Sequence, residues 1–132
     1  LNSTIETLRD LDGCSGKVGT VGFCLGGRLA FLTATRTKAD AAVSYYGVML
    51  TEHIGETINA PLILHVPTED QFVSPEQQAE VRAALEGNDK VTIYGYRGQG
   101  HAFARVGGQH YHQASAEAAR ERTLDLFKTH LG

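Results

Sequence analysis

The chain has 132 residues and a formal net charge of −3, with 42% hydrophobic and 20% charged residues. This size and composition are typical of one globular domain, and the mild negative charge argues against nucleic acid or an anionic membrane as a partner. There are two cysteines and no apolar stretch near the ~18 residues of a spanning helix. We therefore expect a protein with no disulfide framework and no membrane span, located in the reducing cytoplasm.

The first predicted element is a helix over residues 3–11. Ser3 and Glu6 have the spacing of a capping box, and Gly13 lies just past the predicted end. Strands and helices then alternate along the rest of the chain. The strands are predicted over 17–23, 41–46, 62–66 and 91–96, and the helices over 26–36, 74–87 and 112–131, with a loop and room for one helical turn over 47–59. Ser74 and Gln77 have the spacing of a second capping box, at the start of the helix over 74–87.

The predicted strands are almost continuously apolar, for example Leu62-Ile63-Leu64-His65-Val66. Such strands are buried on both faces, and their alternation with helices favours parallel pairing. The sequence therefore predicts an α/β fold with a parallel sheet of about four strands and flanking helices.

A cysteine follows the first predicted strand in the run Gly22-Phe23-Cys24-Leu25-Gly26. This run fits the pattern G-x-nucleophile-x-G, in which the nucleophile lies on a strained turn and side chains on its neighbours would collide with the strand or the following helix. The helix behind the turn presents free N–H groups, which stabilise a thiolate, and the N–H of Leu25 is a natural oxyanion donor. The alternative interpretation is a buried structural cysteine at a glycine-rich strand end.

Two later residues have the positions that a catalytic cysteine needs. Asp70 follows the strand over 62–66, and His101 follows the strand over 91–96. Both lie at the carboxyl edge of a parallel sheet, in the chain order nucleophile, acid, histidine. His101 would take the proton of Cys24 and Asp70 would orient the imidazole, with Glu69 as a second candidate acid. Taken singly, the aspartate could be a turn residue and the histidine a loop residue.

The sequence resembles the dienelactone hydrolase family, the carboxymethylenebutenolidases. The matching stretches are GKVGTVGFCLGGRLAF, AAVSYYGV, EDQFVSP, GHAFAR and ERTLDLF. The resemblance implies an α/β-hydrolase fold without a cofactor, and a triad that opens a small lactone or ester through an acyl-thioester. It makes Cys24 the nucleophile, Asp70 the acid and His101 the base. Arg105 matches an arginine that binds a substrate carboxylate, whereas Ala102 stands where the best-known members carry a serine.

The resemblance covers the C-terminal half of the family fold. We therefore expect residues 1–132 to form the C-terminal part of a single α/β-hydrolase domain. The family's N-terminal strands would be absent, together with a glutamate, a second substrate-binding arginine and the other oxyanion N–H. The strand over 17–23 would then be an open apolar edge, which recruits a partner. We expect the partner to be the protein's own N-terminal fragment, with a homodimer as the alternative.

Several other residues have simpler interpretations. His65 is predicted to be a hydrogen-bonded core residue, and Cys14 to be incidental. His110-Tyr111-His112 is too short a signal for a metal site. Of Tyr45 and Tyr46, one could face the pocket.

Two further functions stay open at this point. A glutamine amidotransferase-like cysteine hydrolase would also place a cysteine on such a turn. That class expects Gln after the last glycine and Glu two residues after the late histidine, where this chain has Arg28 and Phe103. A redox-sensing or interaction module would use the Cys24 thiol without a triad.

Overall fold

The computed structural model describes all residues, 1–132, and orders them into alternating helices and strands. The elements are α1 Asn2–Arg9, β1 Gly19–Phe23, α2 Leu25–Arg36, β2 Ala41–Tyr45, the 3-10 turn η1 Leu50–Glu52, β3 Leu62–Pro67, α3 Pro75–Leu85, β4 Val91–Tyr96 and α4 Gln113–Leu131. Each predicted element is present, with bounds shifted by two residues or fewer.

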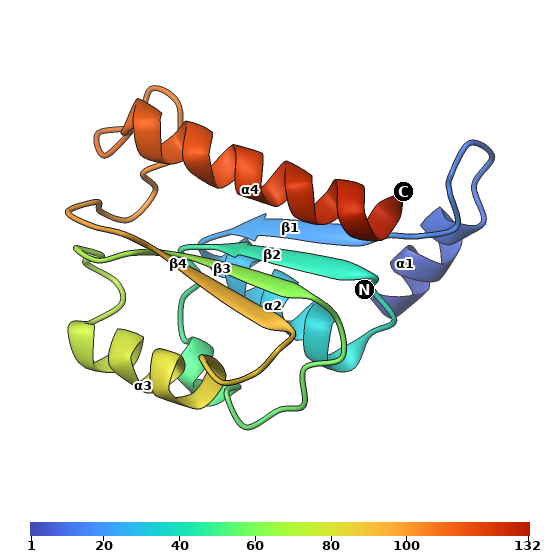
Figure 1. The fold of residues 1–132 in the computed structure, drawn as a ribbon, viewed down its shortest axis with the longest axis horizontal. Coiled ribbons are helices and arrows are strands. Elements are labelled where there is room, and N and C mark those ends of the chain that lie inside the picture. Colours follow the sequence, from blue (N-terminus) through green and yellow to red (C-terminus); the bar gives the residue numbers. More distant parts are fainter.

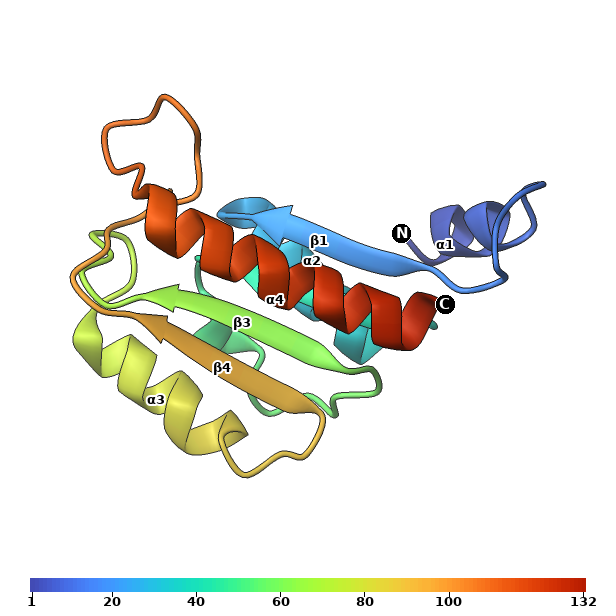
Figure 2. The ribbon, with the colours of Figure 1, turned by 45° about the horizontal axis from the view of Figure 1, so that its top comes forward.

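The four strands form one parallel sheet in the order β1-β2-β3-β4. Helix α4 lies on one face of the sheet and helices α2 and α3 lie on the other (Figure 1). Figure 2 shows α4 crossing in front of the strands, while α1 stands apart beside the start of β1. The predicted α/β architecture is confirmed, and β1 and β4 are the two edges of the sheet.

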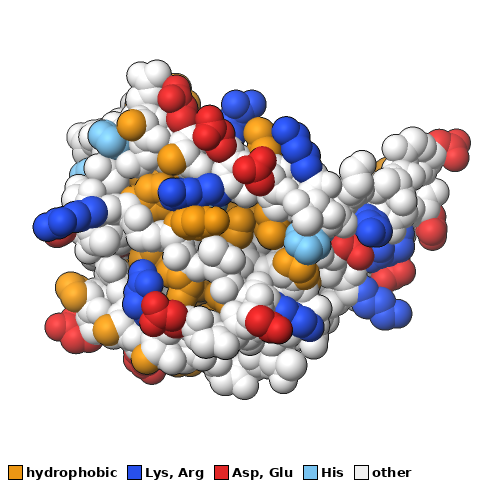
Figure 3. All heavy atoms as spheres, viewed as in Figure 1, with side chains coloured by type: hydrophobic (Ala, Val, Ile, Leu, Met, Phe, Trp, Pro, Cys, Tyr) orange, Lys and Arg blue, Asp and Glu red, His pale blue; other side chains and the backbone are white.

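The core has two parts, one on each face of the sheet. Phe31, Leu62 and Leu85 belong to the cluster under α2 and α3, and Val43 and Phe103 belong to the cluster under α4. Strand β2 is buried along its whole length, which explains its almost continuously apolar sequence. On the face seen in Figure 3, hydrophobic side chains gather between α4 and α3, with charged side chains of both signs around them.

The two predicted capping boxes have different outcomes. At α3 the box forms, because Ser74 Oγ accepts from Gln77 N at 3.2 Å and Gln77 Oε1 accepts from Ser74 N at 3.0 Å. At α1 the prediction is wrong, because Ser3 lies inside the helix and Leu1 is the N-cap residue without a side-chain cap. Ile5 N donates to Leu1 O at 3.0 Å, so the helix starts two residues earlier than the capping pattern indicated.

His65 is fully buried on β3, and its ring nitrogens are both hydrogen-bonded. Its Nε2 lies 3.0 Å from Thr123 Oγ1 and its Nδ1 lies 2.8 Å from the hydroxyl of Tyr96. Because the Thr123 hydroxyl donates to Ala119 O, it accepts from His65, and the Tyr96 hydroxyl donates to the other ring nitrogen. The prediction of a hydrogen-bonded core histidine is confirmed.

Burial, and then the nearby Arg122 guanidinium, lowers the pKa of His65 to about 3. The ordinary value of about 6.5 returns on unfolding, so the unfolded chain binds a proton below pH 6.5 that the folded chain rejects. We expect the free energy of unfolding to fall between pH 6.5 and pH 3, by up to about 1.4 kcal/mol per pH unit.

Urea unfolding at a series of pH values measures this loss of stability, and NMR of the His65 ring measures its protonation. We expect the ring signals of folded protein to stay constant from pH 7 to pH 5 and those of urea-unfolded chain to titrate. A folded-state midpoint near 6.5 would show that burial does not control this histidine.

Candidate active site

Cys24 lies on the turn between β1 and α2, in a backbone conformation that is rare for a residue with a side chain. Its φ is 58° and its ψ is −116°. Backbone hydrogen bonds hold the turn, since Cys24 N donates to Tyr45 O at 3.0 Å and Arg28 N donates to Cys24 O at 3.2 Å. The thiol is thereby fixed at the carboxyl end of β1, where the predicted elbow would place it.

The glycines around Cys24 do not all serve the same purpose. A Cβ at Gly22 would overlap the backbone carbonyl of Gly26, and a Cβ at Gly27 would lie 2.7 Å from Tyr45 O. A Cβ at Gly26 would meet nothing within 4 Å. The expectation that glycines on both sides of the cysteine avoid a collision is therefore wrong for Gly26, because this position faces open space.

Asp70 and His101 form a buried pair on the loops that follow β3 and β4. The two carboxylate oxygens of Asp70 lie 3.1 and 3.0 Å from His101 Nδ1, and Asp70 also accepts from Phe72 N at 2.8 Å. A carboxylate can only accept, so Nδ1 carries the proton and Nε2 is left as the basic nitrogen. Glu69, the second candidate acid, is exposed and does not contact the imidazole.

The cysteine and the histidine line one open cavity of about 550 Å³ at the carboxyl edge of the sheet. Eight residues form its wall: Phe23, Cys24, Tyr46, Phe72, His101, Ala102, Ala104 and Arg105. The thiol and the imidazole make no direct hydrogen bond with each other, although both face this cavity. Arg105 is exposed, so its guanidinium is available to a ligand at the edge of the cavity.

Leu25 is the first residue of α2, directly after the cysteine. Its N–H belongs to the first helical turn and has no intrahelical acceptor. The aligned peptide dipoles of α2 add partial positive charge at this end. The structure therefore leaves a free donor one residue from the thiol, where an oxyanion would need it.

Two aromatic rings frame the imidazole. Tyr46, with a φ of 39°, has its ring 5.0 Å from that of His101 and lines the cavity. Burial first, then Tyr45 and Cys24, raises the pKa of Tyr46 to about 12, so its hydroxyl keeps a proton to donate. Of the two tyrosines considered from sequence, this one faces the pocket.

Phe72 is a residue of the site for which the sequence predicted no role. Its ring lies 4.7 Å from that of His101 in an edge-to-face arrangement, although the side chain is 64% exposed. The sequence signal that could have indicated Phe72 is its position two residues after Asp70, in the loop that follows β3. This phenylalanine covers one face of the imidazole and limits its contact with water.

Three other residues considered in the sequence, Cys14, His110 and His112, do not line the cavity. The thiol of Cys14 lies 3.7 Å from Lys17 O, before β1. His112 caps α4 by accepting from Ser115 N at 3.3 Å, and His110 is exposed.

No helix of the structure is both long and apolar enough to cross a membrane.

The model of the dienelactone hydrolase family matches residues 1–131. A relative from Azospirillum brasilense is 50% identical over 110 residues, which cover 82% of this chain and 48% of the relative. Carboxymethylenebutenolidase 1 of Cupriavidus pinatubonensis is 36% identical over 128 residues, which cover 96% of this chain and 54% of that protein.

The solved structures agree with this family. A dienelactone hydrolase-like protein of Klebsiella pneumoniae superposes with a TM-score of 0.76 at 27% identity, over 83% of this chain and 51% of that one. The chain spans about half the length of the curated relatives it matches.

Proposed function

Since the chain belongs to the dienelactone hydrolase family, we propose that it carries the triad of a hydrolase that cleaves small esters or lactones. The observation that carries the proposal is the buried Asp70–His101 pair, whose imidazole lines the same cavity as the strained Cys24 turn. The family match also favours this function over a glutamine amidotransferase. The two free cysteines fit a reducing cytoplasm.

In the first half of the reaction, His101 Nε2 takes the proton of Cys24 Sγ and the thiolate attacks the acyl carbon. The tetrahedral oxyanion accepts from the N–H of Leu25. The carbon–oxygen bond of the ester then breaks, and the alkoxide leaves with the proton from His101. Asp70 holds the ring and stabilises the imidazolium while it carries this proton.

In the second half, His101 takes a proton from a water molecule that attacks the acyl-thioester. The carbon–sulfur bond breaks, the carboxylic acid is released and Cys24 recovers its proton from the imidazolium. For a lactone, the leaving alkoxide stays attached to the acyl group, so the product is one open-chain hydroxy acid.

Selective alkylation tests the activation of Cys24. We expect iodoacetamide near neutral pH to label Cys24 well before Cys14, because only the first thiol lies at a helix N-terminus and faces the catalytic cavity. Peptide mass spectrometry after short exposures gives the two rates. Equal rates, or faster labelling of Cys14, would count against the proposed nucleophile.

Arg105 is proposed to bind a carboxylate on the substrate, away from the bond that breaks. Arg105→Ala should then lower kcat/KM for an anionic ester about ten- to a hundredfold more than for a neutral aryl ester, because a charge-assisted contact is lost. Arg97→Ala is the matched control, since Arg97 is exposed on the same loop outside the cavity wall. A ratio of the two rates that stays unchanged in Arg105→Ala would refute this role.

We also propose a partner for β1, which pairs with β2 on one side only. Val21 and Phe23 on this edge are 48% and 50% exposed. The curated relatives are about twice as long as this chain, so the partner we favour is a strand from the remaining part of the family fold. Such a strand would also close the catalytic cavity beside Phe23.

A further inference from the structure

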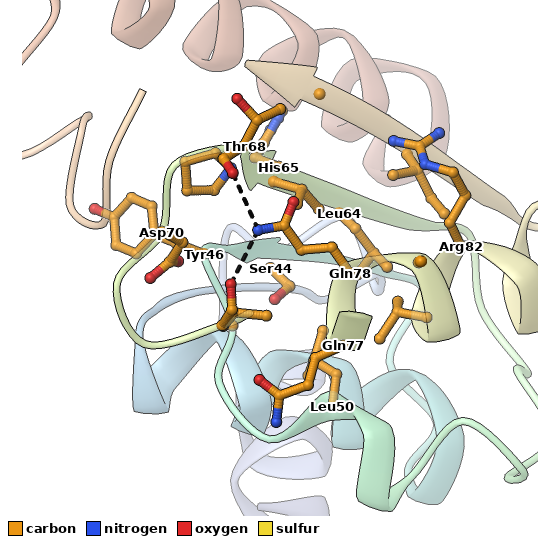
Figure 4. Close-up of a pocket in the computed structure, with 18 of the residues that line it drawn as sticks. Ser44, Tyr46, Leu50, Leu64, His65, Thr68, Asp70, Gln77, Gln78 and Arg82 are labelled. Atoms are coloured by element: carbon orange, nitrogen blue, oxygen red, sulfur yellow. Dashed lines mark hydrogen bonds between the residues drawn. The ribbon is translucent and has the colours of Figure 1, made fainter. Parts of the chain in front are cut away.

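A second cavity, of about 480 Å³, lies on the α2 and α3 face of the sheet. Helix α3 and strands β2, β3 and β4 form its walls, and residues 49–51 contribute a further side (Figure 4). Cys24, His101 and Arg105 line the other cavity and do not line this one. The second cavity therefore opens on another face than the cavity of Cys24 and His101, although Tyr46 contributes to both and Asp70, the proposed triad acid, lies in its wall.

Most of the second cavity's wall is apolar. Its nine hydrophobic residues include Leu50, Leu64, Val66, Val73, Val81 and Ile93. A volume of 480 Å³ falls in the range of small-molecule sites, which is about 300–1,000 Å³. The wall therefore suits the body of a small apolar molecule.

Ser44 places one polar group in this wall. The residue is only 1% exposed on β2, and its Oγ has no hydrogen-bond partner in the structure. Side chains at Gly27 or Gly47 would crowd this hydroxyl, with Cβ atoms 2.9 and 2.5 Å from it, so glycines at both positions leave it free. Because a buried hydroxyl without a partner is costly, Ser44 points to a ligand with a hydrogen-bonding group.

A second polar group comes from α3. Gln78 Nε2 donates to Val73 O at 3.0 Å and to Thr68 O at 3.4 Å, as the dashed lines in Figure 4 show. These bonds fix the side chain and leave its carbonyl oxygen without a donor. A ligand hydroxyl could donate to this oxygen while it accepts from Ser44.

The charged groups of the wall argue for an uncharged ligand. Asp70 is engaged with His101, and Glu69 is exposed. Arg82 is exposed and already lies 3.6 Å from Glu86. An anion would meet two carboxylates, and a cation would find no free buried partner.

We propose that this cavity binds a small uncharged alcohol or phenol, with its apolar body against α3 and its hydroxyl on Ser44. A serine hydroxyl both donates and accepts, so it can pair with the hydroxyl of the ligand. The proposal does not depend on the reaction at Cys24, since neither Cys24 nor His101 lines this cavity and Asp70 already pairs with His101.

NMR titration of the full chain with phenol and with toluene tests this site. We expect saturable phenol binding that shifts the amide signals of Ser44, Leu64 and Val81. Ser44→Ala should weaken phenol binding about two- to tenfold, the value of one hydrogen bond, and change toluene binding less than twofold. Ser3→Ala, on the exposed face of α1, is the matched control.

A second pair of variants tests the cavity without its hydroxyl. Ala79→Phe places a ring in the wall and should reduce binding of both probes, whereas Ala83→Phe, outside the wall of the same helix, should not. The proposal would be overturned by the absence of saturable binding, by shifts confined to Cys24 and His101, or by equal loss of phenol and toluene in Ser44→Ala.

Discussion

Cys24→Ala should abolish ester hydrolysis, and His101→Ala should lower kcat/KM on the order of 10⁴-fold in the active form of the protein. The reason is that the cysteine supplies the atom that forms the thioester, and the imidazole moves the proton in both half-reactions. Steady-state rates on a neutral aryl ester measure both losses. Asp70→Asn should also lower kcat/KM severely. A carboxylate only accepts hydrogen bonds, whereas the amide of asparagine also donates, so the proton is no longer held on Nδ1.

The controls for these variants come from the same chain. Cys14→Ala should keep full activity, because its thiol lies before β1, outside the cavity. Glu69→Gln should keep most activity, because this carboxylate does not contact the imidazole. If Cys24→Ala hydrolysed the ester at the wild-type rate, the proposed triad would be wrong.

The chain alone should not persist as a stable 14.2 kDa monomer, because the open edge of β1 recruits another strand. Residues along a strand alternate in the side to which their N–H groups point. Val18 O and Cys24 N both bond toward β2, so the N–H groups of Thr20 and Gly22 face β2 as well. The N–H groups of Val21 and Phe23 then face the open edge.

Light scattering and amide hydrogen exchange measure this edge. We expect the part of the Azospirillum brasilense relative outside the matched region to bind the chain and to protect the Val21 and Phe23 amides. The Thr20 and Gly22 amides are the internal control, since β2 protects them in either state. A homodimer with protected Val21 and Phe23 amides would point to the second copy instead. A stable monomer that ignores the added fragment would refute the pairing.

Much of this fold could be predicted because its signals are local. Mostly apolar runs and glycine or proline at their ends predict the strands, and Ser74 with Gln77 predicts the start of α3. The start of α1 could not be predicted in the same way. There, the hydrogen bond from Ile5 N to Leu1 O moves the start of the helix ahead of Ser3. A capping pattern does not indicate which of two possible starts forms.

The candidate site also has residues that the sequence could predict and residues that it could not. Cys24, Asp70 and His101 each follow their own strand, so chain order and parallel pairing were enough to bring them to one edge. The ring of Phe72 over His101 and the free hydroxyl of Ser44 depend on how loops and helices pack across the sheet. At Gly26 the motif predicted a steric constraint that the structure does not have, because this position faces open space.

Trapping the acyl-enzyme tests the proposed reaction most directly. The active protein is mixed with p-nitrophenyl acetate, quenched in acid within the first turnovers and analysed by intact and peptide mass spectrometry. We expect one acetyl group, carried as a thioester on Cys24 and absent from Cys24→Ala. An acetyl group on another residue, or turnover with no acyl-enzyme and an intact rate in Cys24→Ala, would contradict it.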